Sequence, residues 1–493
     1  MAVRPVESLS TPNPITKREI ALAWLVSLAI LIPCVWHRHV QAGDVASHIY
    51  NAWLAQLVGE GKAPGVCLVW QYKNVLFDLM LLYLGKVLGF GVAEKTAVGV
   101  CVLVFFWGVF TLATVEAGRR PWYLVPGLAM LAYGYVFTMG FMNFYLSLGL
   151  ACFALAALWQ GSPRGVLIAI VLAPVVLLAH PLGCLWLLAA GAYRLLWPRV
   201  NGWMEWLLPG VAVGVALAVR WVLLHHPEYQ TDWPDKPVLQ WNGADQFWIF
   251  RPETRYIAAA TALFVVSATL LDVLPWKRDE RGWKERRLFL EFYAVSFLLT
   301  TLLPENLRPD PNAGWVGLLV SRLTLIGAIF AFCWVATLRP KAWHMVALTG
   351  IAAVFFVFAY QGTALAERVE TSAERITRQL PFGTRVLASI WEPPDYRMGT
   401  LHVVDRACIG HCFVYSNYEP ATKQFRVRVN EGSPVVTASA DDSEDMQFGD
   451  YDVQDEDLPL KQIYQCDSAD WTKLCIRDLR AGEKNGAGPV HPN

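Results

Sequence analysis

Three polar side chains near the N-terminus, Asp44, His48 and Asn51, have types and a spacing that could do chemistry. They stand at positions i, i+4 and i+7, so in a helix they would share one face. Apolar side chains such as Ile49 and Leu54 make up most of another face. A carboxylate beside an imidazole can take up and pass on a proton. Asp44 and His48 are therefore the candidate catalytic residues, and Asn51 is a candidate for binding substrate.

Asp44 and His48 each have a plainer interpretation as well. An acidic residue directly before a helix is a common N-cap, and Asp44 precedes a helix that we expect over 45–58. His48 on its own is equally well explained as an ordinary surface histidine. Capping and catalysis are compatible, because the start of a helix also holds a carboxylate rigidly.

The chain around this stretch has the composition of a membrane protein. Its 493 residues are 55% hydrophobic and only 17% charged, and the 22 tryptophans suit the two interfaces of a bilayer. The formal net charge is zero, which gives no indication of a nucleic-acid partner. No A-x-A-like cleavage site follows the first apolar run, 20–36, so we interpret this run as a retained first span.

Apolar runs long enough to cross a bilayer recur along most of the chain. Eleven spans are expected, at 20–36, 96–116, 122–138, 142–160, 164–180, 182–198, 204–224, 256–275, 287–304, 315–337 and 343–362. With residues 1–19 in the cytoplasm, the basic clusters between spans then lie inside, as the positive-inside rule requires. Segment 74–90 carries Asp78 and Lys86, so we predict an interfacial or re-entrant helix there; counted as a span it would be the twelfth.

This topology predicts an α-helical polytopic membrane protein in two parts. Residues 20–362 form the multispan domain, and its first outer loop, 37–95, carries interfacial helices. Residues 363–483 form a small extracytoplasmic α/β or α+β domain, followed by a disordered tail at 484–493.

The C-terminal part is expected to hold one helix and a few short strands. The helix covers 366–379, with Thr371 or Ser372 as its cap. The strands are expected at 384–390, 412–416 and 425–429, and an acidic run at 438–457 is expected to be a mobile loop.

Four cysteines of the C-terminal part stand in two sets, Cys408 with Cys412 and Cys466 with Cys475. On an oxidising side of the membrane they predict one or two disulfides, with pairing within or between the sets left open. A zinc site built from Cys408, His411 and Cys412 is the alternative, although C-x-x-H-C fits no common zinc pattern.

Further polar residues are expected to face the same outer side as Asp44. Asn143 and His180 stand at outer ends of spans, while Arg220 and Arg322 lie within spans near their outer ends. A buried arginine costs at least ~2.5 kcal/mol on insertion scales, so it needs an anion or must reach water. Arg322, roughly 10 Å inside its expected span, is less able to reach water. These four residues are the remaining candidates for binding substrate, and phosphate is the anion that suits a guanidinium.

With these features together, the chain resembles the GT-C superfamily of membrane glycosyltransferases. The resemblance rests on the span 20–36, on Gly43-Asp44 with the helix 45–58, on the amphipathic segment 74–90 and on the soluble part after 363. The chain is also similar to a group of bacterial multispan proteins with outer motifs of the kinds D-x-x-x-H, G-F-x-N-F and H-P. Here these motifs are Asp44/His48, Gly140 to Phe144 and His180-Pro181.

The resemblance implies a reaction at the outer face of a bacterial inner membrane. A polyprenyl-phosphate sugar donor would lie in the outer leaflet, and Asp44 would act as general base toward an acceptor that the sequence does not identify. We expect Arg322 or Arg220 to bind the leaving phosphate. The outer loops between later spans carry no D-x-D or E-x-D motif, so no cofactor is predicted, and a divalent metal has no support.

Two other functions stay open. A transporter or lipid-handling membrane protein would use the arginines for an anionic substrate and the C-terminal part as a lid, and inverted repeats would support it. A non-catalytic envelope scaffold would bind a partner through its C-terminal part. Geometry discriminates between them, because an outer cavity shared by Asp44, His48 and Arg322 favours the transferase. A helix cap that faces bulk solvent favours the scaffold.

Overall fold

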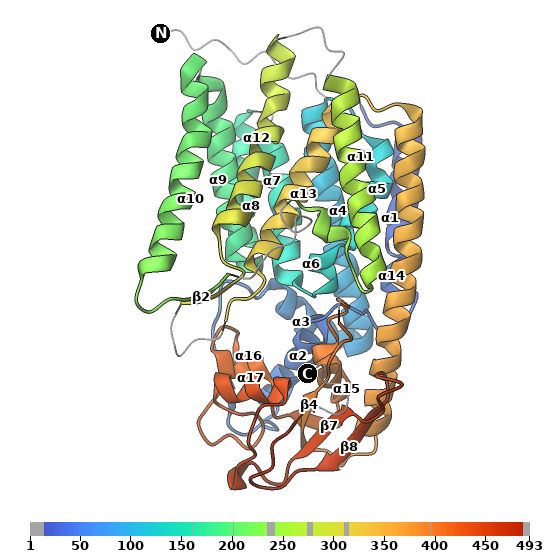
Figure 1. Cartoon of the computed structure of the whole chain (residues 1–493), viewed down its shortest axis with the longest axis vertical. Coiled ribbons are helices and arrows are strands. Elements are labelled where there is room, and N and C mark those ends of the chain that lie inside the picture. Colours follow the sequence, from blue (N-terminus) through green and yellow to red (C-terminus); the bar gives the residue numbers. More distant parts are fainter. Residues whose placement is uncertain are drawn as a thin grey trace.

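The fold is a bundle of long helices with a small sheet at one end. A computed structural model describes residues 14–159, 161–200, 202–233, 242–273, 280–309, 315–394 and 396–486. Figure 1 shows the long helices side by side, with the orange and red C-terminal elements gathered at the lower end of the bundle. Helices α2 and α3 lie between the two.

The helices follow one another with short connections along most of the chain. They are α1 (Lys17–Ile30), α2 (Val45–Gly59), α3 (Leu76–Leu88), α4 (Phe90–Ala117), α5 (Val125–Ala132), α6 (Tyr135–Thr138), α7 (Met142–Trp159), α8 (Pro163–Ala179), α9 (Pro181–Leu196), α10 (Leu207–His225), α11 (Arg255–Val273), α12 (Glu280–Leu302), α13 (Leu319–Thr337), α14 (Ala342–Thr377), α15 (Val403–Ala407), α16 (Tyr418–Thr422) and α17 (Ala440–Phe448). The strands are β1 (Val66–Leu68), β2 (Gln230–Asp232), β3 (Asn306–Arg308), β4 (Thr384–Ser389), β5 (Cys412–Val414), β6 (Val427–Val429), β7 (Lys461–Gln465) and β8 (Leu474–Asp478).

Six helical stretches of the described chain are long and apolar enough to cross a membrane, which is consistent with an integral membrane protein. They are Phe90–Ala117, Met142–Trp159, Gly202–His225, Pro252–Leu271, Leu319–Thr337 and Ala342–Thr377. Helix α8 is apolar but shorter. The other expected spans stay predictions. Segment 74–90 forms α3, whose 13 residues are fewer than the ~17 that a span needs.

The stretch 122–138, expected as one span, is broken at Gly134 into α5 and α6. Gln246, from a distant loop, fills the break: its Oε1 accepts a hydrogen bond of 3.3 Å from the Val136 amide. A Cβ atom on Gly134 would lie 2.8 Å from the Gln246 carbonyl oxygen. In apolar surroundings an interrupted helix persists only where such partners satisfy its backbone.

The helix predicted at 366–379 is instead the end of α14, which runs without a break for 36 residues. The predicted cap Ser372 lies within this helix, and its hydroxyl accepts a hydrogen bond of 3.0 Å from the Leu474 amide in β8. Helix α14 therefore leads directly from the bundle to the C-terminal sheet (Figure 1).

The C-terminal sheet has four strands in the order β5-β4-β7-β8. Strand β4 is parallel to both β5 and β7, and β7 and β8 form an antiparallel hairpin. Strands β4 and β5 fall at predicted positions. Strand β6, also predicted, leaves this sheet and pairs antiparallel with β1, with Val66 opposite Val429. The C-terminal part is thereby joined to the segment between α2 and α3.

The acidic run 438–457, predicted to be a mobile loop, contains helix α17. The Ser439 hydroxyl caps it by accepting a hydrogen bond of 3.1 Å from the Asp442 amide. Acidic side chains in a first turn also interact favourably with the helix dipole. The predicted tail 484–493 begins in ordered structure, because Asn485 is buried and donates a hydrogen bond of 2.7 Å to the Met446 carbonyl oxygen. Residues 487–493 lie outside the described chain.

Candidate functional site

A cavity of about 970 Å³ lies between the ends of the bundle helices and the C-terminal part. Its wall includes the first turn of α2, loop residues 70–74, the starts of α7, α9 and α13, and residues of α16 and α17. Five of the predicted site residues line it: Asp44, His48, Asn143, His180 and Arg322. Asn51 and Arg220 lie outside its described wall. Residues far apart in sequence therefore line one cavity.

Asp44 stands at the N-cap position of α2, but its side chain makes no capping hydrogen bond. The capping interpretation is therefore wrong for this carboxylate. The side chain is 26% exposed, lines the cavity, and has its Oδ1 atom 3.6 Å from His402 Nε2. A carboxylate released from capping and facing a cavity can act on a ligand.

A glycine turn holds the Asp44 backbone in place. The Asp44 amide donates a hydrogen bond of 3.0 Å to the Met139 carbonyl oxygen. The next residue, Gly140, has a φ of +82°, and a Cβ atom there would lie 2.4 Å from the Asp44 nitrogen. Only glycine fits this close approach without moving Asp44. The first residue of the G-F-x-N-F motif thus positions Asp44.

His48 reaches the cavity wall but is paired with carboxylates. Its Nδ1 atom lies 2.8 Å from Asp78 Oδ1 and 3.4 Å from Glu419 Oε1. Burial alone would lower the pKa of His48, but the charges of Asp78 and Glu419 outweigh it and raise the pKa to about 10. The imidazole is therefore a cation at neutral pH and has no lone pair with which to accept a proton. His48 joins α2 to α3 and α16 as an ion-pair partner.

His48, Asp78 and Glu419 are also residue types that bind metals, and one ligand atom from each lies within 4.8 Å of the others. His48 already occupies the space between the two carboxylates. The Ser47 hydroxyl donates a further hydrogen bond of 3.2 Å to Glu419. The contacts among these groups are those of a buried ion-pair cluster, and the absence of a cofactor stays a prediction.

Both predicted asparagines serve as connectors between elements. Asn143 accepts a hydrogen bond from the Phe77 amide and donates one to Asp78 Oδ2, each 2.8 Å long. Asn51 and Asn417 exchange hydrogen bonds of 2.8 and 3.2 Å between α2 and the turn before α16. Their amide groups are used to fix the wall, so in this geometry they support the site rather than face a ligand.

Arg322 lies in the first turn of α13, closer to the helix end than expected. The span predicted at 315–337 begins only at Leu319, because Val316 is extended and forms backbone hydrogen bonds with Leu307. The Arg322 guanidinium lies over the Phe141 ring, 4.2 Å from its centre. Its buried Nε atom has no hydrogen-bond partner in the described part of the chain. A guanidinium with a donor left over is suited to bind an anion.

His180 and Arg220 differ in their relation to the cavity. His180 caps α9, with its Nδ1 atom accepting a hydrogen bond of 3.1 Å from the Leu182 amide, and still lines the wall. Arg220 donates a hydrogen bond of 3.1 Å to the Leu302 carbonyl oxygen and lies over the Trp233 ring. The structure thus brings His180, but not Arg220, to Arg322.

Sequence reasoning missed the residues that the C-terminal part contributes to the wall. Among them are His402 and Tyr418, whose rings lie 5.1 Å apart. The wall also carries more basic side chains than carboxylates. The basic residues are Lys73, Arg308, Arg322, Lys423 and Arg428, against Asp44, Asp441 and Glu444. This balance favours an anionic ligand, and no local motif marks the added residues.

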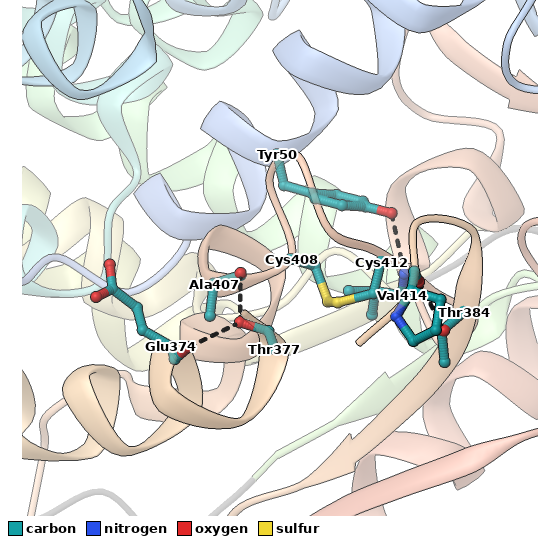
Figure 2. The surroundings of a disulfide bond; sticks show 9 residues. Tyr50, Glu374, Thr377, Thr384, Ala407, Cys408, Cys412 and Val414 are labelled. Atoms are coloured by element: carbon teal, nitrogen blue, oxygen red, sulfur yellow. Dashed lines mark hydrogen bonds between the residues drawn. A yellow bond between two sulfur atoms is a disulfide. The ribbon is translucent and has the colours of Figure 1, made fainter. Parts of the chain in front are cut away.

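Helix α15, which follows His402, is anchored at its C-terminal end by a disulfide. Cys408 and Cys412 join this end to β5 (Figure 2). The Thr377 hydroxyl donates a hydrogen bond of 2.7 Å to the Ala407 carbonyl oxygen. The disulfide between Cys408 and Cys412 leaves no free thiolate from these two residues for the alternative zinc site. The other pair, Cys466 and Cys475, is also a disulfide.

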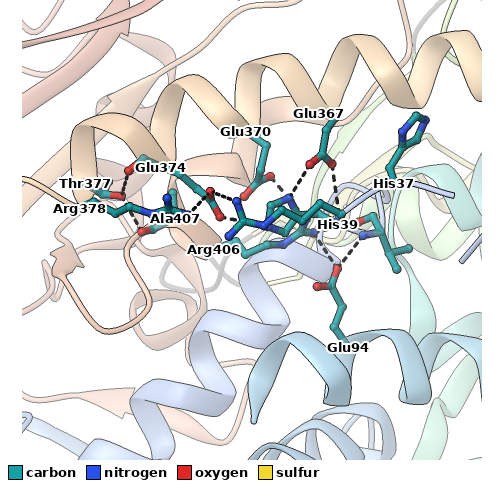
Figure 3. A network of polar contacts seen from close by, with 12 residues as sticks. His37, His39, Glu94, Glu367, Glu370, Glu374, Thr377, Arg378, Arg406 and Ala407 are labelled. Atoms are coloured by element: carbon teal, nitrogen blue, oxygen red, sulfur yellow. Dashed lines mark hydrogen bonds and ion pairs between the residues drawn. The ribbon is translucent and has the colours of Figure 1, made fainter. Parts of the chain in front are cut away.

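A buried charge cluster anchors the same helix to the bundle (Figure 3). Arg406 lies 3.2 Å from Glu94 of α4 and 3.4 Å from Glu370 of α14, and donates a hydrogen bond of 3.0 Å to the Val40 carbonyl oxygen. His39 contacts two further glutamates of α14, at 3.0 and 3.1 Å. The cluster ties α15 to the segment that leads into Asp44.

Comparison with known proteins finds no matching family model, no matching curated protein and no matching solved structure.

Proposed function

We propose that this protein is a membrane glycosyltransferase that moves a sugar from a polyprenyl-phosphate donor to an acceptor on the outer face of the membrane. The observation that carries the proposal is that the Asp44 carboxylate and the Arg322 guanidinium line one cavity. Transfer of a sugar needs a base for the acceptor and a cation for the departing phosphate.

In the proposed reaction the acceptor hydroxyl oxygen attacks the anomeric carbon of the donor sugar. The bond between that carbon and the phosphate oxygen breaks, and polyprenyl phosphate leaves with the electron pair. Asp44 takes the hydroxyl proton. Arg322 offsets the charge on the leaving phosphate, and the apolar ring of Phe141 strengthens this interaction by excluding water.

The proposed setting is a bacterial inner membrane with the N-terminus in the cytoplasm and the cavity outside. The six long apolar helices support the membrane part of this proposal, and the eleven-span topology remains part of it. Helices α8 and α9 expose leucines and valines near the Pro181 end of the cavity, including Val175, Leu177 and Leu185. The polyprenyl chain would lie along such a surface in contact with membrane lipid.

A transporter or lipid-handling protein could use the same cavity and is the second candidate. What favours the transferase is that the Asp44 side chain faces the cavity and makes no capping hydrogen bond. The scaffold alternative predicts that Asp44 caps a helix and faces bulk solvent. The Asp44 side chain instead makes no capping hydrogen bond and lines the cavity.

Deleting the gene tests the proposal. We expect polyprenyl-phosphate-linked sugars to accumulate in the membrane, as measured by mass spectrometry of extracted lipids. They should accumulate in the outer leaflet, where periodate added to intact spheroplasts can oxidise them. Accumulation in a periodate-protected leaflet indicates a transporter. An unchanged pool contradicts both functions.

Replacing Arg322 with glutamine is expected to lower kcat/KM for the lipid donor by about 10- to 100-fold, because one hydrogen bond between charged groups is lost. The measurement is the rate at which protein in nanodiscs consumes the lipid-linked sugar extracted from the deletion strain. Arg220→Gln is the matched control, since Arg220 is also half-buried at a helix end but lies outside the wall. Equal losses in both variants would contradict the assignment of Arg322.

A further inference from the structure

His402 lies between two carboxylates at the cavity wall. Its Nε2 atom is 3.6 Å from Asp44 Oδ1, and its Nδ1 atom is 3.2 Å from Asp405 Oδ2. The side chains of His402 and Asp405 are only 8% and 6% exposed. The three residues form a line that starts in the buried part of the C-terminal region and ends at the base proposed for the reaction.

We propose that His402 is a positioning residue for Asp44 and that Asp405 holds its imidazole in place. This inference rests on the proposed function of Asp44. Asp405 Oδ2 lies at ion-pair distance from Nδ1 without meeting the geometry of a hydrogen bond. Its charge attracts the protonated ring from the side of Nδ1, and Nε2 faces Asp44 on the other side.

The charges around the imidazole favour its protonated form. Burial alone would lower the pKa of His402, but the side-chain contact with Asp405 and the charges of Asp405, Asp44 and Glu419 together raise it. The remaining ring neighbour is Tyr418, which is neutral because burial holds its pKa well above the ordinary value. A cation 3.6 Å from Asp44 Oδ1 attracts that carboxylate and holds it in place at the cavity wall.

Helix α15 is anchored independently of His402, so a positioning role of His402 can be told apart from a purely structural one. The helix is held by the Cys408–Cys412 disulfide and by Arg406, both on the side of the helix away from His402 in sequence. Removing the His402 imidazole leaves these attachments intact. A loss of function in such a variant would then come from Asp44 rather than from a displaced helix.

The direct test is a nuclear magnetic resonance titration of the protein with ¹³C-labelled histidine in nanodiscs, with the His402 signal assigned from His402→Gln. We expect the midpoint to fall in Asp44→Asn and again in Asp405→Asn, because each variant removes a neighbouring negative charge that raises the pKa of His402. The signal of His226, which is exposed, serves as the control and should be the same in all three proteins. A His402 midpoint that Asp44→Asn does not move overturns the inference, whatever the protein's function.

The consequence for the reaction is a change in pH dependence. In His402→Gln the fall in rate that accompanies deprotonation of His402 on the alkaline side of the pH–rate profile should disappear. In Asp405→Asn it should move to lower pH, because Asp405 raises the pKa of His402. His226→Gln should leave the profile unchanged. A lower rate with the same profile would mean that His402 is only structural. Retained transfer in Asp44→Asn would instead overturn the role of Asp44 as general base and leave the titration result standing.

Discussion

Replacing Asp44 with asparagine is expected to lower the rate of sugar transfer by about 10²- to 10⁴-fold, the usual contribution of a general base. The amide has the same shape as the carboxylate but cannot accept the hydroxyl proton. Folding should be unaffected, because the Asp44 side chain makes no capping bond and asparagine is itself favoured at this position. The measurement is the lipid-linked sugar pool of the deletion strain carrying the variant gene, with the protein level determined in the same membranes.

Asp441→Asn is the matched control for this experiment. Asp441 also lines the cavity, but its carboxylate pairs with Arg308 at 2.8 Å and its side chain is 67% exposed. We expect this variant to restore the normal lipid pool as wild type does. A normal pool in Asp44→Asn at equal protein level would remove Asp44 from the reaction.

Replacing Arg406 with methionine is expected to destabilise the protein by about 3–5 kcal/mol, the cost of removing one partner from a buried ion pair. Methionine fills a similar volume but leaves Glu94 and Glu370, both almost fully buried, without their cation. It also leaves the Val40 carbonyl oxygen without its side-chain donor. Because Val40 leads into Asp44, the loss should loosen the site as well as the fold.

The measurement is the Tm of purified protein in detergent, followed by intrinsic fluorescence. Arg38→Met is the control, since Arg38 pairs with Glu374 at 2.8 Å but its side chain is 60% exposed. An exposed pair of this kind contributes about 1 kcal/mol or less. If both variants lowered Tm equally, the buried cluster in Figure 3 would not be the main attachment of α15.

The sequence was sufficient to find several of the residues that line the cavity. The distance from Asp44 to a span and the helical spacing of His48 are local properties. Arg322 was singled out because a charge in an apolar run is costly wherever its partner lies. These arguments need no knowledge of the fold, and they identified three residues that line the cavity: Asp44, His48 and Arg322.

The roles of the same residues could not be read from spacing. His48 lies on the expected face, but Asp78 and Glu419 convert it to a buried cation. Asn143 lines the cavity, and its amide is used by α3. In both cases the partner belongs to another element, so only the packed structure decides between binding a ligand and supporting the site.

Contacts between distant segments account for the other differences. Strand β6 left the predicted C-terminal sheet because β1, a stretch without a strong strand pattern, offers it a partner. The helix at 122–138 broke because Gln246 enters from a distant loop. His402 was not found since nothing near it in sequence indicates that it lies beside Asp44.

The most direct test of the account follows the reaction itself. Purified protein in nanodiscs is incubated with the lipid-linked sugar that accumulates in the deletion strain and with an extract of the cell envelope as the source of acceptor. The account predicts that wild-type protein converts the donor to free polyprenyl phosphate, detected by mass spectrometry, and that Asp44→Asn does not. Donor that stays intact in the presence of wild-type protein, or that is consumed equally by both proteins, would contradict it.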